Sequence, residues 1–154
     1  LMKVVKQIRK HQPKIIITNS RKDRHPDHEA ASRLVKKACF LSGLVKINTK
    51  FEGENQSPWR PKSILYSIQN NYVDPDFVID ITKFYDKKVE AINCFKSQFY
   101  DPKSKEPKSF ISSKEFMNFI NSRAIEMGHS IGVEYGEGFT SENKLQINSL
   151  DSII

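Results

Sequence analysis

Two histidines, His25 and His28, lie three residues apart in the segment Arg24-His25-Pro26-Asp27-His28. On a helix this spacing brings two side chains to one face, and a neutral imidazole is a preferred zinc ligand. A carboxylate such as Asp27 can fix the tautomer of a neighbouring ring and raise its basicity. The alternative is a surface loop with two solvated histidines, in which Pro26 begins a helix and Asp27 complements its dipole. Because the spacing is not His-Glu-x-x-His, it does not decide between the two interpretations.

The elements around this pair predict where it lies. The β-branched run 15–18 has the pattern of a strand buried on both faces, which is typical of a central parallel strand. Pro26 can take the first position of a helix that ends at Gly43. In open parallel sheets, ligands bind beyond the carboxyl ends of the strands, where helix N-termini converge. We therefore expect His25 and His28 to face one crevice at that edge of the sheet.

The rest of the chain alternates between helix and strand signals, which favours an α/β fold, Rossmann-like, with a mostly parallel sheet flanked by helices. We expect one domain over residues 1–154. The predicted elements are a helix near the start, strands at 64–68 and 77–81, helices at 87–99 and 112–128 (the second capped by Ser112 and Glu115), and a short edge strand at 145–147. Because the first helix has no cap before Leu1, we expect preceding residues in the parent protein.

The composition restricts the kind of partner. The formal charge of +7 suits an acidic ligand. However, the lysines are spread along the chain, without the basic and aromatic stretch of a nucleic-acid groove, so we expect no nucleic acid. No apolar run is long enough to span a membrane, and no signal peptide opens the chain. Cys39 and Cys94 form no Cys-x-x-Cys pair and are expected as buried thiols, so the prediction is a cytoplasmic protein.

The stretch from Ile15 to His28, Ile-Ile-Ile-Thr-Asn-Ser-Arg-Lys-Asp-Arg-His-Pro-Asp-His, resembles the second signature of the LmbE-like, or PIG-L-like, zinc N-deacetylases. The resemblance continues through residues 77–82, 88–91, 97–99 and 132–139, which are similar to the bacillithiol-pathway branch. It covers essentially the whole chain. It implies that residues 1–154 are the C-terminal part of one such deacetylase domain, without its first strand and helix.

The resemblance also implies roles for the residues of the motif. His28 would bind zinc, His25 would stabilise the oxyanion of a tetrahedral intermediate, and Asp27 would orient His25. The zinc would lower the pKa of a water molecule and polarise an acetamide carbonyl.

Three further residues are candidates for the site. Tyr135, in a glycine-rich loop with Glu137, would be a second oxyanion donor or a gate, or else a turn residue packed on the core. We include Glu137 among the substrate-binding residues. Arg24 would bind the carboxylate of an acidic sugar conjugate, or else be a solvated charge.

The chain departs from the family pattern in one respect. The first signature, Ala-His-Pro-Asp-Asp, which supplies the other zinc ligands and the general base, is not in this sequence. We expect a missing N-terminal segment or a second chain to supply it, because catalytic zinc normally has three protein ligands. His129 is expected as an exposed loop residue rather than a substitute ligand. Trp59 and Arg60 would stack on a sugar or, as we favour, lie at a subunit contact of a homo-oligomer.

The expected function is that of a cytoplasmic zinc-dependent hydrolase that removes acetate from an N-acetylglucosamine conjugate. The resemblance points to N-acetylglucosaminyl malate in bacillithiol synthesis. The parent protein would be the enzyme, and this chain alone would be inactive. The alternative is a non-catalytic sugar-binding or assembly fragment of such a domain.

Overall fold

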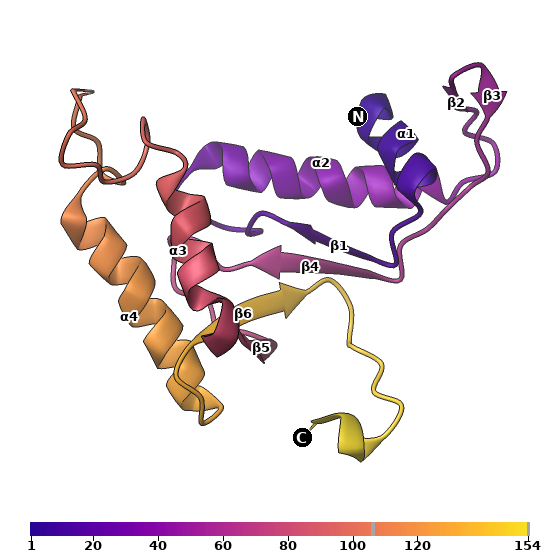
Figure 1. Ribbon diagram of the computed structural model, residues 1–154. Helices are drawn as coiled ribbons and strands as arrows, with labels where there is room; N and C mark the ends of the chain where they lie inside the picture. Colours follow the sequence, from indigo (N-terminus) through magenta and orange to yellow (C-terminus); the bar gives the residue numbers. More distant parts are fainter. Residues whose placement is uncertain (106, 154) are drawn as a thin grey trace. The chain divides into compact units, whose positions relative to one another are not determined.

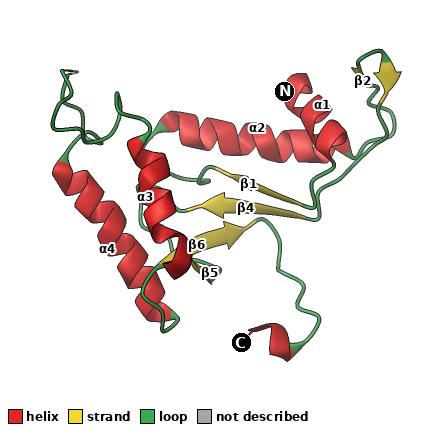
Figure 2. Ribbon diagram, viewed as in Figure 1, coloured by secondary structure: helices red, strands yellow, loops and turns green. Residues whose placement is uncertain are grey.

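The computed structural model describes residues 1–105 and 107–153. The chain divides into two compact units, Leu1–Asp76 with the segment that follows from Phe139 (unit 1) and Phe77–Gly138 (unit 2). A four-stranded sheet has the order β1-β4-β6-β5. The helices and strands follow the alternation that the sequence predicts (Figures 1 and 2). The α/β class is therefore confirmed.

Unit 1 contains α1 (Met2–His11), β1 (Ile15–Thr18), α2 (Pro26–Ser42), β2 (Lys50–Phe51), β3 (Glu54–Asn55), β4 (Ser63–Ser67) and η2 (Leu150–Ile153). β1 and β4 are parallel, with Ile15 beside Ser63 and Thr18 beside Tyr66. Their carboxyl ends therefore lie next to each other, and the loop that leaves β1 leads directly into α2. This arrangement places the His25–His28 segment at the predicted edge of the sheet.

The third strand of unit 1 runs in the opposite direction. β6 (Gly136–Ser141) begins in unit 2, and its residues 139–141 pair with β4 in antiparallel register. β1 and β4 pair in parallel, whereas β4 and β6 pair in antiparallel register. Over these three strands the sheet is therefore mixed, and not mostly parallel as predicted. The sequence misses β6 because its residues, Gly-Glu-Gly-Phe-Thr-Ser, include two glycines, which usually indicate a loop.

The core of unit 1 lies between α1, α2 and one face of the sheet. Val5, Ile8, Ala38 and Cys39 are buried there, with Ile16 of β1 and Ile64 of β4 packed against them. Burial raises the pKa of the Cys39 thiol to about 11, so it stays protonated at neutral pH. Cys39 is buried as predicted, whereas Cys94 is exposed and follows α3, so that part of the prediction is wrong.

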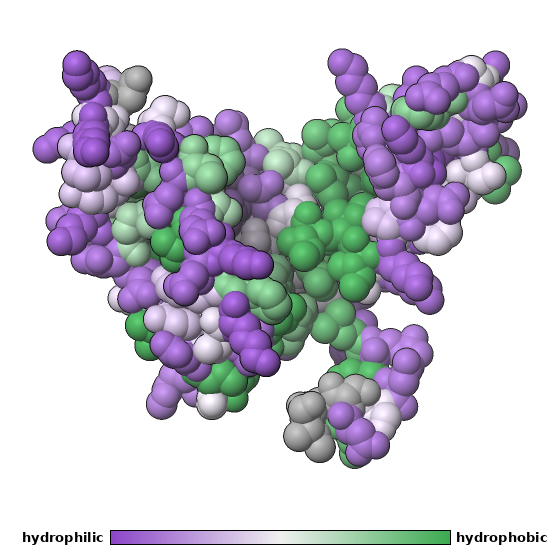
Figure 3. Space-filling model, in the orientation of Figure 1, coloured by the Kyte–Doolittle hydropathy of each residue, from purple (hydrophilic) through white to green (hydrophobic). Residues whose placement is uncertain are grey.

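The other face of β1 is not covered by the described residues. Ile15 and Ile17 are 56% and 60% exposed, so the prediction of a strand buried on both faces is wrong for this chain. β1 is also at the end of the strand order. Figure 3 shows hydrophobic residues gathered over the part of unit 1 where β1 and β4 run.

A buried cation connects α1 to the end of α2. Arg9 is 3% exposed, and its guanidinium donates hydrogen bonds to neutral oxygens, namely the carbonyls of Ser42, Leu44 and Ile47 and the hydroxyl of Thr49. The end of a helix carries partial negative charge on its free carbonyls, which favours a cation there. Arg9 therefore holds the segment that follows α2 against α1.

Unit 2 contains β5 (Phe77–Asp80), η1 (Thr82–Phe84), α3 (Tyr85–Asn93) and α4 (Lys114–Ser130). Tyr85, Ala124 and Met127 are buried in it. Phe99, Phe110 and Phe119 surround Phe116, with ring centroids 5.3–6.2 Å apart. These rings form an aromatic cluster at the start of α4, in which Phe110 and Phe119 stay 57% and 36% exposed. No helix in the described part of the chain is both long and apolar enough to cross a membrane.

Several predicted boundaries are corrected. The cap of α4 is Ser113, whose hydroxyl accepts from the amide of Phe116, and not Ser112. The helix predicted over 87–99 ends at Asn93, and Phe95 beyond it is 59% exposed. Residues 145–147 form no strand; Leu145 and Ile147 are 39% and 56% exposed, so no burial stabilises one there.

A polar network crosses the sheet face of unit 1 that lies under α2. The hydroxyl of the buried Tyr66 donates to Glu142 at 2.6 Å, and the ammonium of Lys36 contacts the other carboxylate oxygen at 2.5 Å. Burial acts to raise the pKa of Glu142, but Lys36 and Tyr66 together outweigh it and the pKa is lowered. Glu142 is thus a carboxylate whose ionised form the fold stabilises.

The sign of this shift makes unit 1 sensitive to acid. A lowered pKa contributes stability that is present above the unfolded value, near 4.3, and is lost as pH falls through the folded value. We expect Glu142→Gln to reduce the free energy of unfolding by roughly 1.5–3 kcal/mol at pH 7 and by less at pH 3.5. Urea unfolding at the two pH values measures this, with Glu54→Gln as an exposed control. An equal loss at both would contradict it.

Candidate functional site

His25 occupies the N-cap of α2 at the edge of the sheet. Its backbone is extended (φ −88°, ψ 123°), and Pro26 follows as the first helical residue, as predicted. The amide of Asp27 donates to His25 Nδ1 at 3.2 Å. An imidazole nitrogen that accepts a hydrogen bond carries no proton, so in the neutral ring the proton lies on Nε2. His25 therefore presents Nε2–H as a donor.

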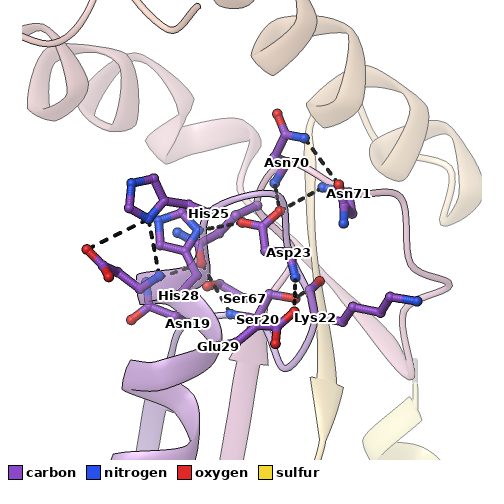
Figure 4. A network of polar contacts seen from close by, with 12 residues as sticks. Asn19, Ser20, Lys22, Asp23, His25, His28, Glu29, Ser67, Asn70 and Asn71 are labelled. Atoms are coloured by element: carbon purple, nitrogen blue, oxygen red, sulfur yellow. Dashed lines mark hydrogen bonds and ion pairs between the residues drawn. The ribbon is translucent and has the colours of Figure 1, made fainter.

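His28 lies one turn further and makes a different contact. Its Nδ1 is 2.5 Å from Oδ2 of Asp23, whose side chain is fully buried. The other carboxylate oxygen, Oδ1, accepts from the amides of Asn70 and Asn71, which follow β4, at 3.1 and 3.0 Å. The side chain of Asp23 thus bridges the helix and the loop after the neighbouring strand (Figure 4).

The charge of Asp23 decides the hydrogen bond to His28. Burial acts to raise the pKa of Asp23, but hydrogen bonds from His28 and from the backbone of Asn71, Arg24 and Asn70 outweigh it, and the pKa is lowered. The carboxylate is therefore ionised at neutral pH and can only accept. The neutral His28 ring must therefore carry its proton on Nδ1, which leaves the lone pair on Nε2.

The structure brings the two rings together. Their centroids are 5.3 Å apart and their planes are tilted by 33°. The side chains are 49% and 31% exposed, so both are reachable by a small molecule. The motif therefore places a hydrogen-bond donor, Nε2–H of His25, near a lone pair on Nε2 of His28.

The chain provides one suitable metal ligand here. A neutral imidazole with a free Nε2 and a carboxylate on Nδ1 is the usual form of a zinc-binding histidine. In residues 1–105 and 107–153, no group of three or more His, Cys, Asp or Glu side chains could hold a metal ion. His28 thus fits zinc as one member of a ligand set.

Asp27 contacts His25 mainly through its backbone. Its carboxylate is 86% exposed and 3.8 Å from His25 Nδ1, further away than its amide nitrogen. Arg24 is exposed, and its amide donates to the Asp23 carboxylate.

Tyr135 and Glu137 are found in unit 2. The ring of Tyr135 stacks on Tyr85, with centroids 3.9 Å apart and planes within 4°. Glu137 forms an ion pair with Lys88 at 2.6 Å. Both contacts link the segment before and within β6 to the start of α3, so each residue has a packing role in its own unit.

Three other residues that the sequence singles out are placed by local contacts. The indole N–H of Trp59 donates to the carbonyl of Pro13, and its ring packs on the core of unit 1. Arg60 donates to the carbonyl of Phe40 and lies over its ring. His129 is exposed, as predicted, but within the last turn of α4 and not in a loop.

Asp23 is the residue that the sequence interpretation missed. It lies five positions before His28, in a loop with the composition of a polar linker, so no helical spacing connects the two. A carboxylate in the loop between a strand and a histidine-bearing helix is the only signal in the sequence, and it is a weak one. Its function depends on Asn70 and Asn71, which are 47 and 48 residues away.

No family model matches the sequence. The structure is similar to that of the conserved protein TT1542 from Thermus thermophilus, with a TM-score of 0.77 and 27% identity over 95% of this chain. It is also similar to N,N'-diacetylchitobiose deacetylase from Pyrococcus horikoshii, with a TM-score of 0.71 and 24% identity over 99% of the chain. This chain shares its fold with both of these proteins.

A third similar structure belongs to an enzyme of another kind. GalB, the 4-carboxy-2-hydroxymuconate hydratase from Pseudomonas putida, has a TM-score of 0.69 and 18% identity over 96% of this chain. This chain spans 60%, 60% and 55% of the lengths of the Thermus protein, the hydratase and the deacetylase. At these identities the hydratase and the deacetylase show the fold and not the reaction.

Proposed function

We propose that this chain is the C-terminal part of a zinc-dependent hydrolase that removes acetate from an N-acetylglucosamine conjugate. The observation that carries the proposal is the opposite hydrogen bonding of the two neighbouring imidazoles. His25 has a donor on Nε2, and His28 has a lone pair on Nε2. Zinc-dependent amide hydrolysis uses both a metal ligand and a group that stabilises a developing oxyanion.

The residues of the chain would divide the work as follows. His28 would hold zinc through Nε2, and Asp23 would keep its proton on Nδ1. When bound, zinc would lower the pKa of a water molecule and polarise the acetamide carbonyl. His25 would donate from Nε2 to the carbonyl oxygen as it gains charge, and the amide of Asp27 would hold the ring in position. On protonation, His25 would give up the hydrogen bond from the Asp27 amide and would then be able to deliver a proton to the leaving amine.

The remaining ligands and the general base would come from another segment or a second chain. A catalytic zinc site normally has three protein ligands, and this chain spans only 55–60% of the structures it resembles. Two observations support this. β1 is at the end of the strand order, so another strand could pair with its free edge. Ile15 and Ile17 are exposed, so another element could pack on that face. The site would then be complete only with that part present.

The substrate would be an acidic conjugate such as N-acetylglucosaminyl malate, the compound of the bacillithiol branch. The net charge of +7 supports an anionic ligand. Arg24 would bind a substrate carboxylate, with Glu137 among the substrate-binding residues and Tyr135 as a second oxyanion donor or gate.

Acetate release tests this function directly. We expect the full-length protein, loaded with Zn²⁺, to release acetate from N-acetylglucosaminyl malate faster than from N-acetylglucosamine, and to lose the activity when a chelator removes the metal. A coupled assay for acetate and mass spectrometry of the free amine measure both products. The hydratase-type activity of a structural neighbour is checked in parallel with an unsaturated carboxylic acid. A zinc-loaded protein that releases no acetate from any N-acetylated sugar would favour the non-catalytic alternative.

A further inference from the structure

Besides the hydrogen bond from the Arg24 amide, the buried carboxylate of Asp23 has partners on two sides. Oδ1 accepts from the amides of Asn70 and Asn71, and Oδ2 contacts His28 Nδ1. Oδ1 therefore binds the loop after β4, and Oδ2 is the oxygen that faces the imidazole of His28. The side chain has no exposed surface, so water does not compete for this contact.

The loop that carries Asp23 is itself fixed. Gln69 accepts from the side-chain amide of Asn19 and from the backbone of Ser20, both at 3.2 Å. The Ser20 hydroxyl donates to the carbonyl of Lys22, and the amide of Asp23 donates to Glu29 of α2 at 3.4 Å. Contacts from the loop after β4 and from α2 thus hold the position of Asp23 relative to His28 (Figure 4).

We infer that Asp23 is a positioning residue that selects the His28 tautomer with Nε2 free to bind a metal ion. That the free Nε2 binds a metal ion rests on the proposed function. That Asp23 selects the tautomer rests only on the contacts of its carboxylate. A neutral histidine without a fixed hydrogen-bond partner populates both tautomers, and only one of them has its lone pair on Nε2. The neighbouring His25, bonded to a backbone amide, is held in the opposite form. The fold therefore sets the two rings independently.

Asp23→Asn separates this role from a purely structural one. In the variant the amide oxygen still accepts from Asn70 and Asn71, so the loop contacts are kept. The side-chain NH2 then faces His28 Nδ1 and donates to it, which requires the lone pair on Nδ1 and the proton on Nε2. The substitution should invert the tautomer of His28 without removing the bridge between the loops.

The tautomer is measured by long-range ¹H–¹⁵N correlation spectra of the metal-free protein, at a pH where both rings are neutral. We expect His28 to be protonated on Nδ1 in the wild type and on Nε2 in Asp23→Asn. Titration calorimetry with Zn²⁺ should show a roughly 10–100-fold weaker affinity for the variant. Glu29→Gln is the matched control, because it changes a carboxylate that contacts the same loop but not His28, and it should leave the tautomer unchanged.

The outcomes separate the inference from the proposed function. A wild-type His28 protonated on Nε2 would overturn the inference whether or not the variant folds. So would an unchanged tautomer in a folded Asp23→Asn protein that binds Zn²⁺ as tightly as the wild type. The expected inversion of the tautomer, in a wild-type protein that binds no Zn²⁺, would support the effect of Asp23 and reject the zinc enzyme.

Discussion

His28→Ala should abolish zinc binding by the full-length protein, whereas His25→Ala should keep the zinc and lose the rate of acetate release. The reason is the different state of the two rings, which lie 5.3 Å apart. His28 has its lone pair on Nε2, and removing it removes a ligand. His25 has its proton on Nε2, and removing it removes a donor to the oxyanion, an effect of roughly 10²–10³-fold in kcat.

The measurement needs two readouts on each protein, metal content by mass spectrometry and kcat for acetate release. His25 also caps α2, and the loss of an N-cap reduces stability by about 0.5–2 kcal/mol. His25→Asn therefore accompanies His25→Ala, because asparagine retains a cap acceptor. His129→Ala is the matched control, since this histidine is exposed on α4. If His25→Ala and His28→Ala both kept their metal and the wild-type rate, the site assignment would be wrong.

The part of the site that could be predicted from the sequence is local. The β-branched run, Pro26 and Gly43 mark the ends of β1 and α2 correctly, and the three-residue spacing brings the imidazoles together. Each of these features depends on backbone geometry over a few residues, which periodicity and capping report.

The features that the sequence did not predict depend on contacts between distant residues. Asp23 acquires its role from the loop after β4, and Arg9 acquires its role from oxygens 33 to 40 residues away. Arg9 occupies a helix position that the periodicity assigns to a charged face, beside Lys3, Lys6 and Lys10. Only the tertiary fold reveals that its guanidinium turns towards the end of α2.

The similar structures limit what the fold alone can say. A deacetylase and a hydratase both share it with this chain, and a fold commonly hosts several reactions. The reaction therefore has to be argued from the site. The pairing of a hydrogen-bond donor with a free lone pair is a property of His25 and His28 in this chain, and it does not depend on which neighbour is considered.

Arg9→Met should be among the most damaging substitutions in unit 1 outside the site. Methionine has a similar length and fills the space, but it leaves three carbonyls without their donor: that of Ser42 in a buried position, and those of Leu44 and Ile47 in partly buried positions. Each buried acceptor left unpaired is unfavourable by roughly 1–3 kcal/mol, and we expect a total loss of about 3–5 kcal/mol in the free energy of unfolding. Because this is a large fraction of the roughly 5–15 kcal/mol by which a domain is stable, the variant should unfold at a clearly lower urea concentration.

The fluorescence of Trp59 can report the unfolding of unit 1. Trp59 is the single tryptophan of the chain, and its indole N–H donates a hydrogen bond to the carbonyl of Pro13 within that unit. Urea unfolding followed by its fluorescence reports the stability of the unit that carries the site. Arg9→Lys should lose less than Arg9→Met, since an ammonium keeps the charge but cannot reach all the oxygens that the planar guanidinium spans. Lys3→Met, on an exposed position of the same helix, should change the free energy by less than about 0.5 kcal/mol. A similar small change for Arg9→Met would mean that the end of α2 satisfies its carbonyls with water, and that the position of α1 against α2 is set by the apolar contacts of Val5 and Ile8 alone.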